Sequence, residues 1–139
     1  MISLRTHNIL DYAIGIVLFV CPALFGFADI DAARNTFVFL GGGLILYSLL
    51  TDYEYSIAKW IPVGLHMALD VAIGFGLMLS PSIFDYRSQL TGVQNVLHFV
   101  LGLGTIALVV FTRPQALAIS SEIETTKFMT EEEERKRAA

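Results

Sequence analysis

Two histidine–aspartate pairs are the residues in this sequence best suited to do chemistry. His7 precedes Asp11 by one helical turn, and His66 precedes Asp70 in the same way. On a helix this i,i+4 spacing places both members of a pair on one face. A carboxylate inside a membrane span costs at least about 2.5–3.5 kcal/mol near the centre, so it usually faces the protein interior and has a partner. The pairs therefore predict either polar contacts between helices or a titratable site such as a proton relay.

Further polar residues are expected on the same side of the membrane as these pairs. The complete candidate cluster is His7, Asp11, Asp52, Glu54, His66 and Asp70. Asp52 and Glu54 fit an interfacial loop; alternatively, one of them accepts a hydrogen bond from a histidine of the pairs. No short ligand-spacing motif joins the six residues, so the sequence predicts no metal site and no cofactor. His98 is expected nearer the opposite side, hydrogen-bonded inside the protein.

The stretches that carry these residues predict membrane-spanning helices. Apolar residues make up 55% of the 139 residues and charged residues only 16%, whereas soluble domains are about 25% charged. Each stretch is close to the ~20 residues that cross a bilayer as a helix. They cover approximately Ile9–Phe27, Thr36–Leu50, Ile61–Leu79 and Val93–Phe111. The predicted fold is an all-α polytopic bundle of four transmembrane helices, because four apolar helices with barely any polar face cannot form a water-soluble surface.

The first and third stretches are copies of one another. Shifting the sequence by 59 residues aligns nine identical positions: His7, Leu10, Asp11, Ala13, Ile14, Gly15, Leu18, Pro22 and Phe25 match His66, Leu69, Asp70, Ala72, Ile73, Gly74, Leu77, Pro81 and Phe84. With one inserted residue, Asn35, Phe39 and Gly42 match Asn95, Phe99 and Gly102. Two spans per unit is an even number, so both units insert with the same orientation. The histidine–aspartate pairs are thus expected at the same depth.

This duplicated unit resembles the SPW-repeat family of small multi-pass prokaryotic membrane proteins, which carry one or two copies of a two-helix unit. The resemblance covers roughly residues 6–113. It depends on the two His-x-x-Leu-Asp openings, the segments 21–27 and 80–84 around the prolines, and the segment 49–54. The tryptophan expected after each proline is replaced by Ala23 and Ser82. The resemblance implies the fold and the prokaryotic membrane; it implies no biochemical activity.

Small residues and prolines indicate how the helices pack and end. Glycines let helix backbones approach closely in a membrane, and those expected at helix contacts are Gly15, Gly42, Gly74, Gly76 and Gly102. Pro22 and Pro81 are expected to kink or end their helices at the outer side. The domain organisation predicted is a first unit over residues 1–55, a second over 56–113 and a charged cytoplasmic tail over 114–139. Thr130 and Glu133 in the tail form a potential capping box for a short helix.

Charge placement bears on location and partners. A net charge of −4 without a basic stripe gives no electrostatic footprint for nucleic acid. Lys and Arg near the span ends weakly favour both termini in the cytoplasm, which implies the prokaryotic inner membrane. The expected partners are the lipid bilayer, possible further copies of the chain, and a possible cytoplasmic partner of the tail.

These observations lead to two hypotheses of function. The first is a non-enzymatic membrane protein with a structural or interacting role, such as an accessory subunit, because the sequence contains no recognisable catalytic arrangement. The alternative is a small proton-coupled or ion/solute carrier that uses the His7/Asp11 and His66/Asp70 pairs.

Overall fold

A computed structural model describes residues 1–112, 129, 135 and 136, and within this part the chain forms four long α-helices. They are α1 (Leu4–Leu24), α2 (Asp31–Leu50), α3 (Val63–Ile83) and α4 (Gly92–Phe111), with a short 3-10 helix η1 (Arg87–Gln89) before α4. Each of the four is long and apolar enough to cross a membrane, which confirms the predicted all-helical class. The predicted tail helix lies outside the described residues, and the division into two units at residue 55 stays a prediction.

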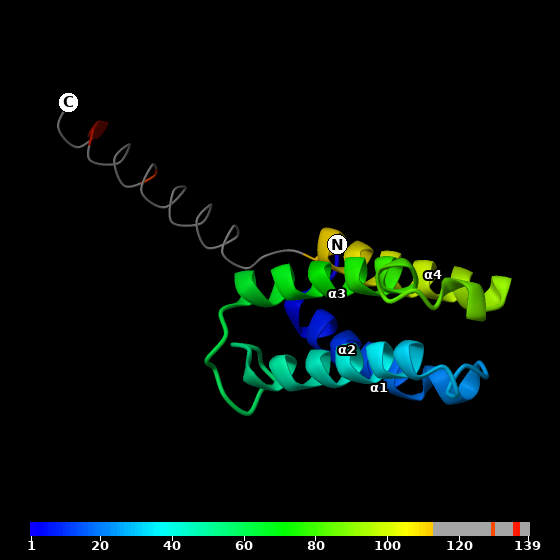
Figure 1. Ribbon diagram of the computed structural model, residues 1–139. Coiled ribbons are helices and arrows are strands. Elements are labelled where there is room, and N and C mark those ends of the chain that lie inside the picture. The colour runs from blue at the N-terminus through cyan, green and yellow to red at the C-terminus, as the bar shows by residue number, and fades with distance from the viewer. Residues whose placement is uncertain (113–128, 130–134, 137–139) are drawn as a thin grey trace.

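The helices form two antiparallel hairpins, α1–α2 and α3–α4, which lie one above the other in Figure 1. Their bounds repeat without deviation. Leu4–Leu24 and Val63–Ile83 are offset by 59 residues, whereas Asp31–Leu50 and Gly92–Phe111 are offset by 61. The connection inside the second hairpin is therefore two residues longer than the connection inside the first.

This offset corrects the predicted alignment of the second helices, which allowed only one inserted residue. With the offset of 61, Leu40, Gly41, Gly43, Ile45 and Thr51 match Leu101, Gly102, Gly104, Ile106 and Thr112. The longer second connection contains η1. Asn35, Phe39 and Gly42 are therefore not the structural counterparts of Asn95, Phe99 and Gly102.

Each hairpin is held by a close crossing of two glycines. A Cβ added to Gly41 on α2 would lie 2.8 Å from the carbonyl oxygen of Gly15 on α1. In the second hairpin, a Cβ added to Gly74 would lie 2.7 Å from the carbonyl oxygen of Gly102. Gly42, predicted at this contact, is not there, because a Cβ added to it would meet nothing within 4 Å. The register error explains the difference.

The predicted role of Pro22 and Pro81 needs a small adjustment. Both prolines lie inside the last turns of α1 and α3, and both are buried. The chain leaves each helix two residues after its last helical residue, through Gly26 and Asp85, which have positive φ angles of 70° and 53°. Left-handed residues at this position are a common way to end a helix. The prolines thus lie close to the helix ends as expected, and the turn residues complete the termination.

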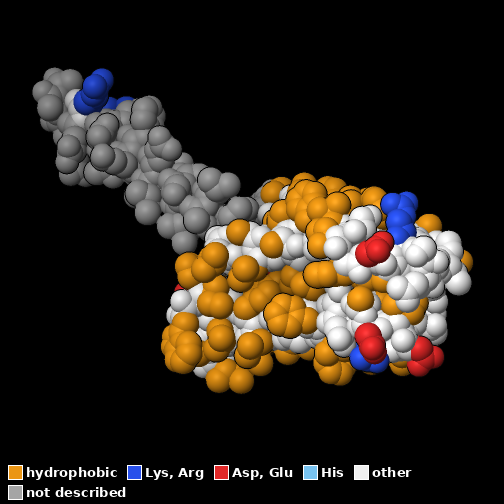
Figure 2. Space-filling view, in the orientation of Figure 1, with side chains coloured by type: hydrophobic (Ala, Val, Ile, Leu, Met, Phe, Trp, Pro, Cys, Tyr) orange, Lys and Arg blue, Asp and Glu red, His pale blue; other side chains and the backbone are white. Residues whose placement is uncertain are grey.

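The outer surface of the bundle is apolar along the helices. Phe39 is 80% exposed, and many other large apolar side chains of the four helices are exposed as well. Figure 2 shows apolar side chains over the helices, with charged side chains gathered at the end where the hairpin connections lie. A surface of this kind is suited to lipid, since aliphatic side chains facing water at this density would drive aggregation.

Candidate functional site

The two histidine–aspartate pairs meet between the hairpins. His7 and Asp11 come from the first turns of α1, and His66 and Asp70 from the first turns of α3. All four side chains are buried, with at most 1% exposed. One nitrogen or oxygen atom from each residue lies within 4.8 Å of the corresponding atoms of the other three. We refer to these four residues as the His–Asp cluster.

The shortest contacts in the His–Asp cluster cross from one unit to the other. His7 Nε2 lies 3.0 Å from Asp70 Oδ2, and His66 Nε2 lies 3.1 Å from Asp11 Oδ2. The contacts within a unit are slightly longer, 3.4 Å for His7–Asp11 and 3.2 Å for His66–Asp70. Each histidine therefore faces both carboxylates. The sequence indicated the pairs within each helix, whereas the cross-unit contacts arise because the side chains of α1 and α3 meet in the interior between the hairpins.

Two threonines fix the orientation of the imidazole rings. His7 Nδ1 lies 2.7 Å from Thr112 Oγ1, and His66 Nδ1 lies 2.8 Å from Thr51 Oγ1. Each hydroxyl donates its single proton to a backbone carbonyl one turn earlier, Leu108 or Tyr47, at 2.6 Å. The hydroxyl can then only accept from the imidazole, so Nδ1 carries a proton and donates it. Nε2 of both histidines is directed at the carboxylates.

Sequence reasoning missed these two threonines. Thr51 directly follows α2 and Thr112 directly follows α4, so neither lies on the helix faces that carry the pairs. They are equivalent under the 61-residue offset. That offset was the signal that could have found them, since it aligns a threonine at the end of each second helix in an otherwise apolar sequence.

Two tyrosines from the first unit complete the surroundings of the His–Asp cluster. Tyr47 on α2 donates its hydroxyl to Asp70 Oδ1 in a short hydrogen bond. The ring of Tyr53 lies 4.7 Å from that of His66 and 6.3 Å from that of His7. Tyr53 lies outside the helices, and burial raises the pKa of its phenol, with the nearby carboxylates acting in the same direction. Its hydroxyl has no hydrogen-bond partner among the described residues.

Asp52 and Glu54, the other two predicted members, lie away from the His–Asp cluster. Asp52 pairs with Lys59 at 2.9 Å and Glu54 with Arg5 at 3.6 Å, and all four of these side chains are more than half exposed. Together with Leu4 and Tyr53 they line a cavity of about 230 Å³. The alternative hypothesis that Asp52 or Glu54 accepts a hydrogen bond from a histidine is therefore wrong, because the threonine hydroxyls occupy that position.

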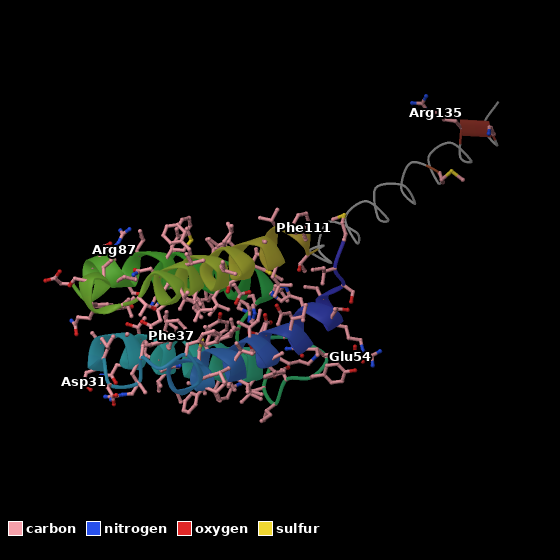
Figure 3. All side chains as sticks on the ribbon, turned by 90° about the vertical axis from the view of Figure 1, so that its right-hand side faces the viewer. Asp31, Phe37, Glu54, Arg87, Phe111 and Arg135 are labelled. Atoms are coloured by element: carbon pink, nitrogen blue, oxygen red, sulfur yellow. The ribbon has the colours of Figure 1, made fainter. Side chains whose placement is uncertain are left out.

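Figure 3 shows how the two ends of the bundle differ. Glu54 and Phe111 lie at the end that holds the His–Asp cluster, and Asp31 and Arg87 lie at the other. Near that other end, Phe37 points between the hairpins and packs against His98, with ring centroids 4.8 Å apart. As expected, His98 is hydrogen-bonded inside the protein, through Nδ1 to the carbonyl oxygen of Gln94 at 2.7 Å.

At the end opposite the His–Asp cluster, equivalent residues of the two units also meet, but they differ in polarity. The first unit contributes apolar residues and the second contributes polar counterparts at the same positions. Cys21, Phe27, Ala33 and Phe37 correspond to Ser80, Tyr86, Gln94 and His98. The polar members are hydrogen-bonded: Tyr86 donates to Ser80 at 2.6 Å, and Gln94 donates across the hairpins to the carbonyl oxygen of Phe25 at 2.9 Å. This end therefore also joins the two units.

The fold and the cluster define a class: a small polytopic membrane protein made of two equivalent helical hairpins. Residues 5–112 match the family model of the SPW repeat domain. The chain belongs to the SPW repeat family, as its sequence resemblance indicated. No curated protein and no solved structure gives a significant match.

Neither position at which the family carries a tryptophan lies between the hairpins. Ala23 and Ser82, which follow the prolines, are exposed near the C-terminal ends of α1 and α3. The neighbouring Cys21 and Ser80 are buried. Replacement of the tryptophan therefore removes a side chain from the lipid-facing surface, where Trp serves as an interfacial anchor, and leaves the packing between the hairpins intact.

Proposed function

We propose that this chain is a non-enzymatic membrane protein of structural or accessory function, in which the His–Asp cluster joins the two hairpins. The observation that carries the proposal is the crossed pairing: each histidine is closer to the aspartate of the other unit than to its own. In an apolar solvent these crossed contacts hold the hairpins in one register, because separating the hairpins breaks the shorter carboxylate contact of each histidine and also its threonine contact.

The packing between the two ends favours this role over that of a carrier. Buried Leu18, Leu44, Ile73 and Leu77 belong to the core between the hairpins. Thr105, which matches Leu44 under the 61-residue offset, donates its hydroxyl to the carbonyl of Leu101 at 2.9 Å. A proton or ion released from the His–Asp cluster toward the far side would have to cross this apolar layer. That crossing is costly without a polar path.

We further propose the prokaryotic inner membrane as the location, with both termini in the cytoplasm. The described helical part begins and ends on one side, since the backbone N–H of Ile2 donates to the carbonyl of Phe111 at 2.8 Å. Arg5 and Lys59 lie on that side, and in the sequence Arg113 directly follows the last residue of the described helical part. Arg34 and Arg87 lie on the other side. The side of a membrane protein that carries more Lys and Arg residues near its helix ends is usually the cytoplasmic side. An accessory role also implies assembly with further copies or with a partner of the tail.

The proposal is tested by removing charge from the cluster. Asp11→Asn and Asp70→Asn should each lower the free energy of unfolding in detergent by about 2–3 kcal/mol, because each leaves the two buried imidazoles to share a single carboxylate. The matched control is Asp52→Asn, the same chemical change in an exposed ion pair at the same end of the bundle, expected to cost under about 1 kcal/mol. Equal stability of all three variants and wild type would contradict the proposed role.

The carrier alternative is tested with the same proteins in proteoliposomes. We expect no pH-driven flux from wild type and none from the Asp11→Asn/Asp70→Asn variant. A flux in wild type that disappears in the double variant, with Asp52→Asn unaffected, would overturn the structural proposal in favour of the carrier.

A further inference from the structure

We propose that the His–Asp cluster binds one divalent transition-metal ion, with zinc as the best match, through Nε2 of His7 and His66 and one carboxylate oxygen each of Asp11 and Asp70. The inference deepens the proposed function, since the ion would join the hairpins through the same four side chains. It differs from the sequence-based prediction, which found no metal motif because the ligands come in two widely separated pairs.

The first argument is the spacing of the ligand atoms. Four ligands at ~2.0–2.1 Å from a tetrahedral zinc ion are separated from one another by about 3.3–3.4 Å. Nε2 of the two histidines lies 3.0 and 3.2 Å from Asp70 Oδ2, 3.1 Å from Asp11 Oδ2 in the case of His66, and 3.4 Å from Asp11 Oδ1 in the case of His7. The nitrogen–oxygen separations are therefore close to the edges of such a tetrahedron before any ion enters. One ligand atom from each residue lies within 4.8 Å of the other three, so the widest separation has to shorten by up to about 1.4 Å as the side chains close on the ion.

The second argument is the direction of the histidine nitrogens. Metal-ligating histidines usually donate their other ring N–H to a fixed acceptor, which sets the tautomer and the ring orientation. Both histidines do so here, to Thr112 and Thr51. Those acceptors are themselves held by bonds to backbone carbonyls. Nε2, the remaining lone-pair position of a neutral ring, is directed toward the carboxylates in both cases.

The third argument is charge. Two carboxylates that are buried this deeply require two positive charges nearby. One divalent ion between neutral imidazoles supplies these charges as completely as two histidine protons do. Two nitrogens and two carboxylate oxygens suit zinc and related first-row ions, whereas magnesium and calcium prefer six or more oxygen ligands.

An entry path exists on the same side of the bundle. The cavity of about 230 Å³ is lined by Asp52, Glu54 and Tyr53 among others. The Tyr53 ring lies between that cavity and the His–Asp cluster, because it lines the cavity and also packs on His66. Rotation of this one side chain, whose hydroxyl has no hydrogen-bond partner in the described part of the chain, would expose the cluster to the cavity.

The experiment uses the full chain, purified in detergent, stripped with a chelator and titrated with Co²⁺ and then Zn²⁺. We expect one ion per chain, the visible absorption of four-coordinate cobalt, displacement by zinc, and a higher unfolding temperature with metal. Asp11→Asn/Asp70→Asn should abolish the spectrum. Thr112→Val should weaken zinc binding about 10- to 100-fold, because it removes an outer-shell hydrogen bond.

The matched control for Thr112→Val is Thr105→Val. Thr105 lies on α4, which Thr112 directly follows, and its hydroxyl makes the same bond to a carbonyl one turn earlier, with no hydrogen bond to His7 or His66 among those of the described residues. It should bind zinc like wild type, and this comparison remains informative even if the double aspartate variant fails to fold.

Two results would overturn the metal proposal. One is a folded wild type, verified by circular dichroism, that binds no metal ion. The other is binding that the aspartate and Thr112 variants leave unchanged, which would place the ion elsewhere in the chain. In either case a loss of stability in Asp11→Asn and Asp70→Asn would leave the proposed structural role standing, so the two proposals fail separately.

Discussion

At the scale of single residues, the His–Asp cluster is organised as two equivalent lines of hydrogen bonds. Each line runs from a backbone carbonyl through a threonine hydroxyl to an imidazole and on to a carboxylate of the other unit. Every donor and acceptor along a line has a defined role, which matters in a low-dielectric interior because unpaired polar groups are costly there. Tyr47 breaks the symmetry, since its counterpart in the second unit is Leu108.

The two tyrosines beside the cluster allow a prediction with an internal control. Tyr47→Phe removes the hydroxyl that donates to Asp70, so it should lower the free energy of unfolding by about 1.5–3 kcal/mol. Tyr53→Phe is the same chemical change at a hydroxyl without a partner among the described residues. It should leave stability unchanged or raise it by up to about 1 kcal/mol. Denaturant titrations of both variants in one detergent check this, and a greater loss in Tyr53→Phe would show that the hydroxyl is bonded.

Residue identity was partly predictable from sequence. His7, Asp11, His66 and Asp70 could be found because ionisable residues inside apolar stretches are rare and usually have a partner, and here they repeat in register. Asp52 and Glu54 were grouped with them by charge and side of the membrane alone. This grouping failed because Asp52 and Glu54 are exposed and pair with Lys59 and Arg5. The groups that contact Nδ1 of the two buried histidines are threonine hydroxyls, which are neutral and cost less to bury than a carboxylate.

At the scale of helices, the depth of the cluster depends on the glycine crossings. Gly15 and Gly41 bring α1 against α2, and Gly74 and Gly102 do the same for α3 and α4. Because both crossings have the same geometry, the two hairpins present their histidines and aspartates at one level. The sequence predicted three of these four glycines. It named the wrong one on α2 because three glycines follow one another there, at positions 41–43, and only the packing register distinguishes them.

The glycine run on α2 supplies the second prediction. Gly41→Ala would place a methyl group 2.8 Å from the carbonyl oxygen of Gly15 and 2.9 Å from Cβ of Leu18. The helices must separate, which should cost about 1–3 kcal/mol of unfolding free energy. Gly42→Ala places the same methyl group in open space, so the better helix propensity of alanine should leave stability unchanged or raise it by up to about 1 kcal/mol. Unfolding titrations that rank the two variants in the reverse order would contradict the crossing.

At the scale of the whole molecule, the two hairpins are joined by polar groups at both ends and by apolar packing between them. The end with the His–Asp cluster is nearly symmetric, whereas the far end has apolar residues in one unit and polar counterparts in the other. One hairpin alone carries one histidine and one aspartate and therefore only half of the cluster. Duplication within a single chain supplies both halves at a fixed stoichiometry and with a fixed parallel orientation.

The orientation of this bundle in the membrane is the last prediction. In a Cys21→Ser background, Ile57→Cys reports on the cluster end and Ser88→Cys on the opposite connection, and both positions are exposed. If the cluster end faces the cytoplasm, a membrane-impermeant maleimide added to intact cells should label Ser88→Cys and spare Ile57→Cys. Both should react after the membrane is permeabilised. The reverse pattern on intact cells would invert the proposed topology. It would also turn the cavity lined by Asp52 and Glu54 outward, so that metal would reach the His–Asp cluster from outside the cell.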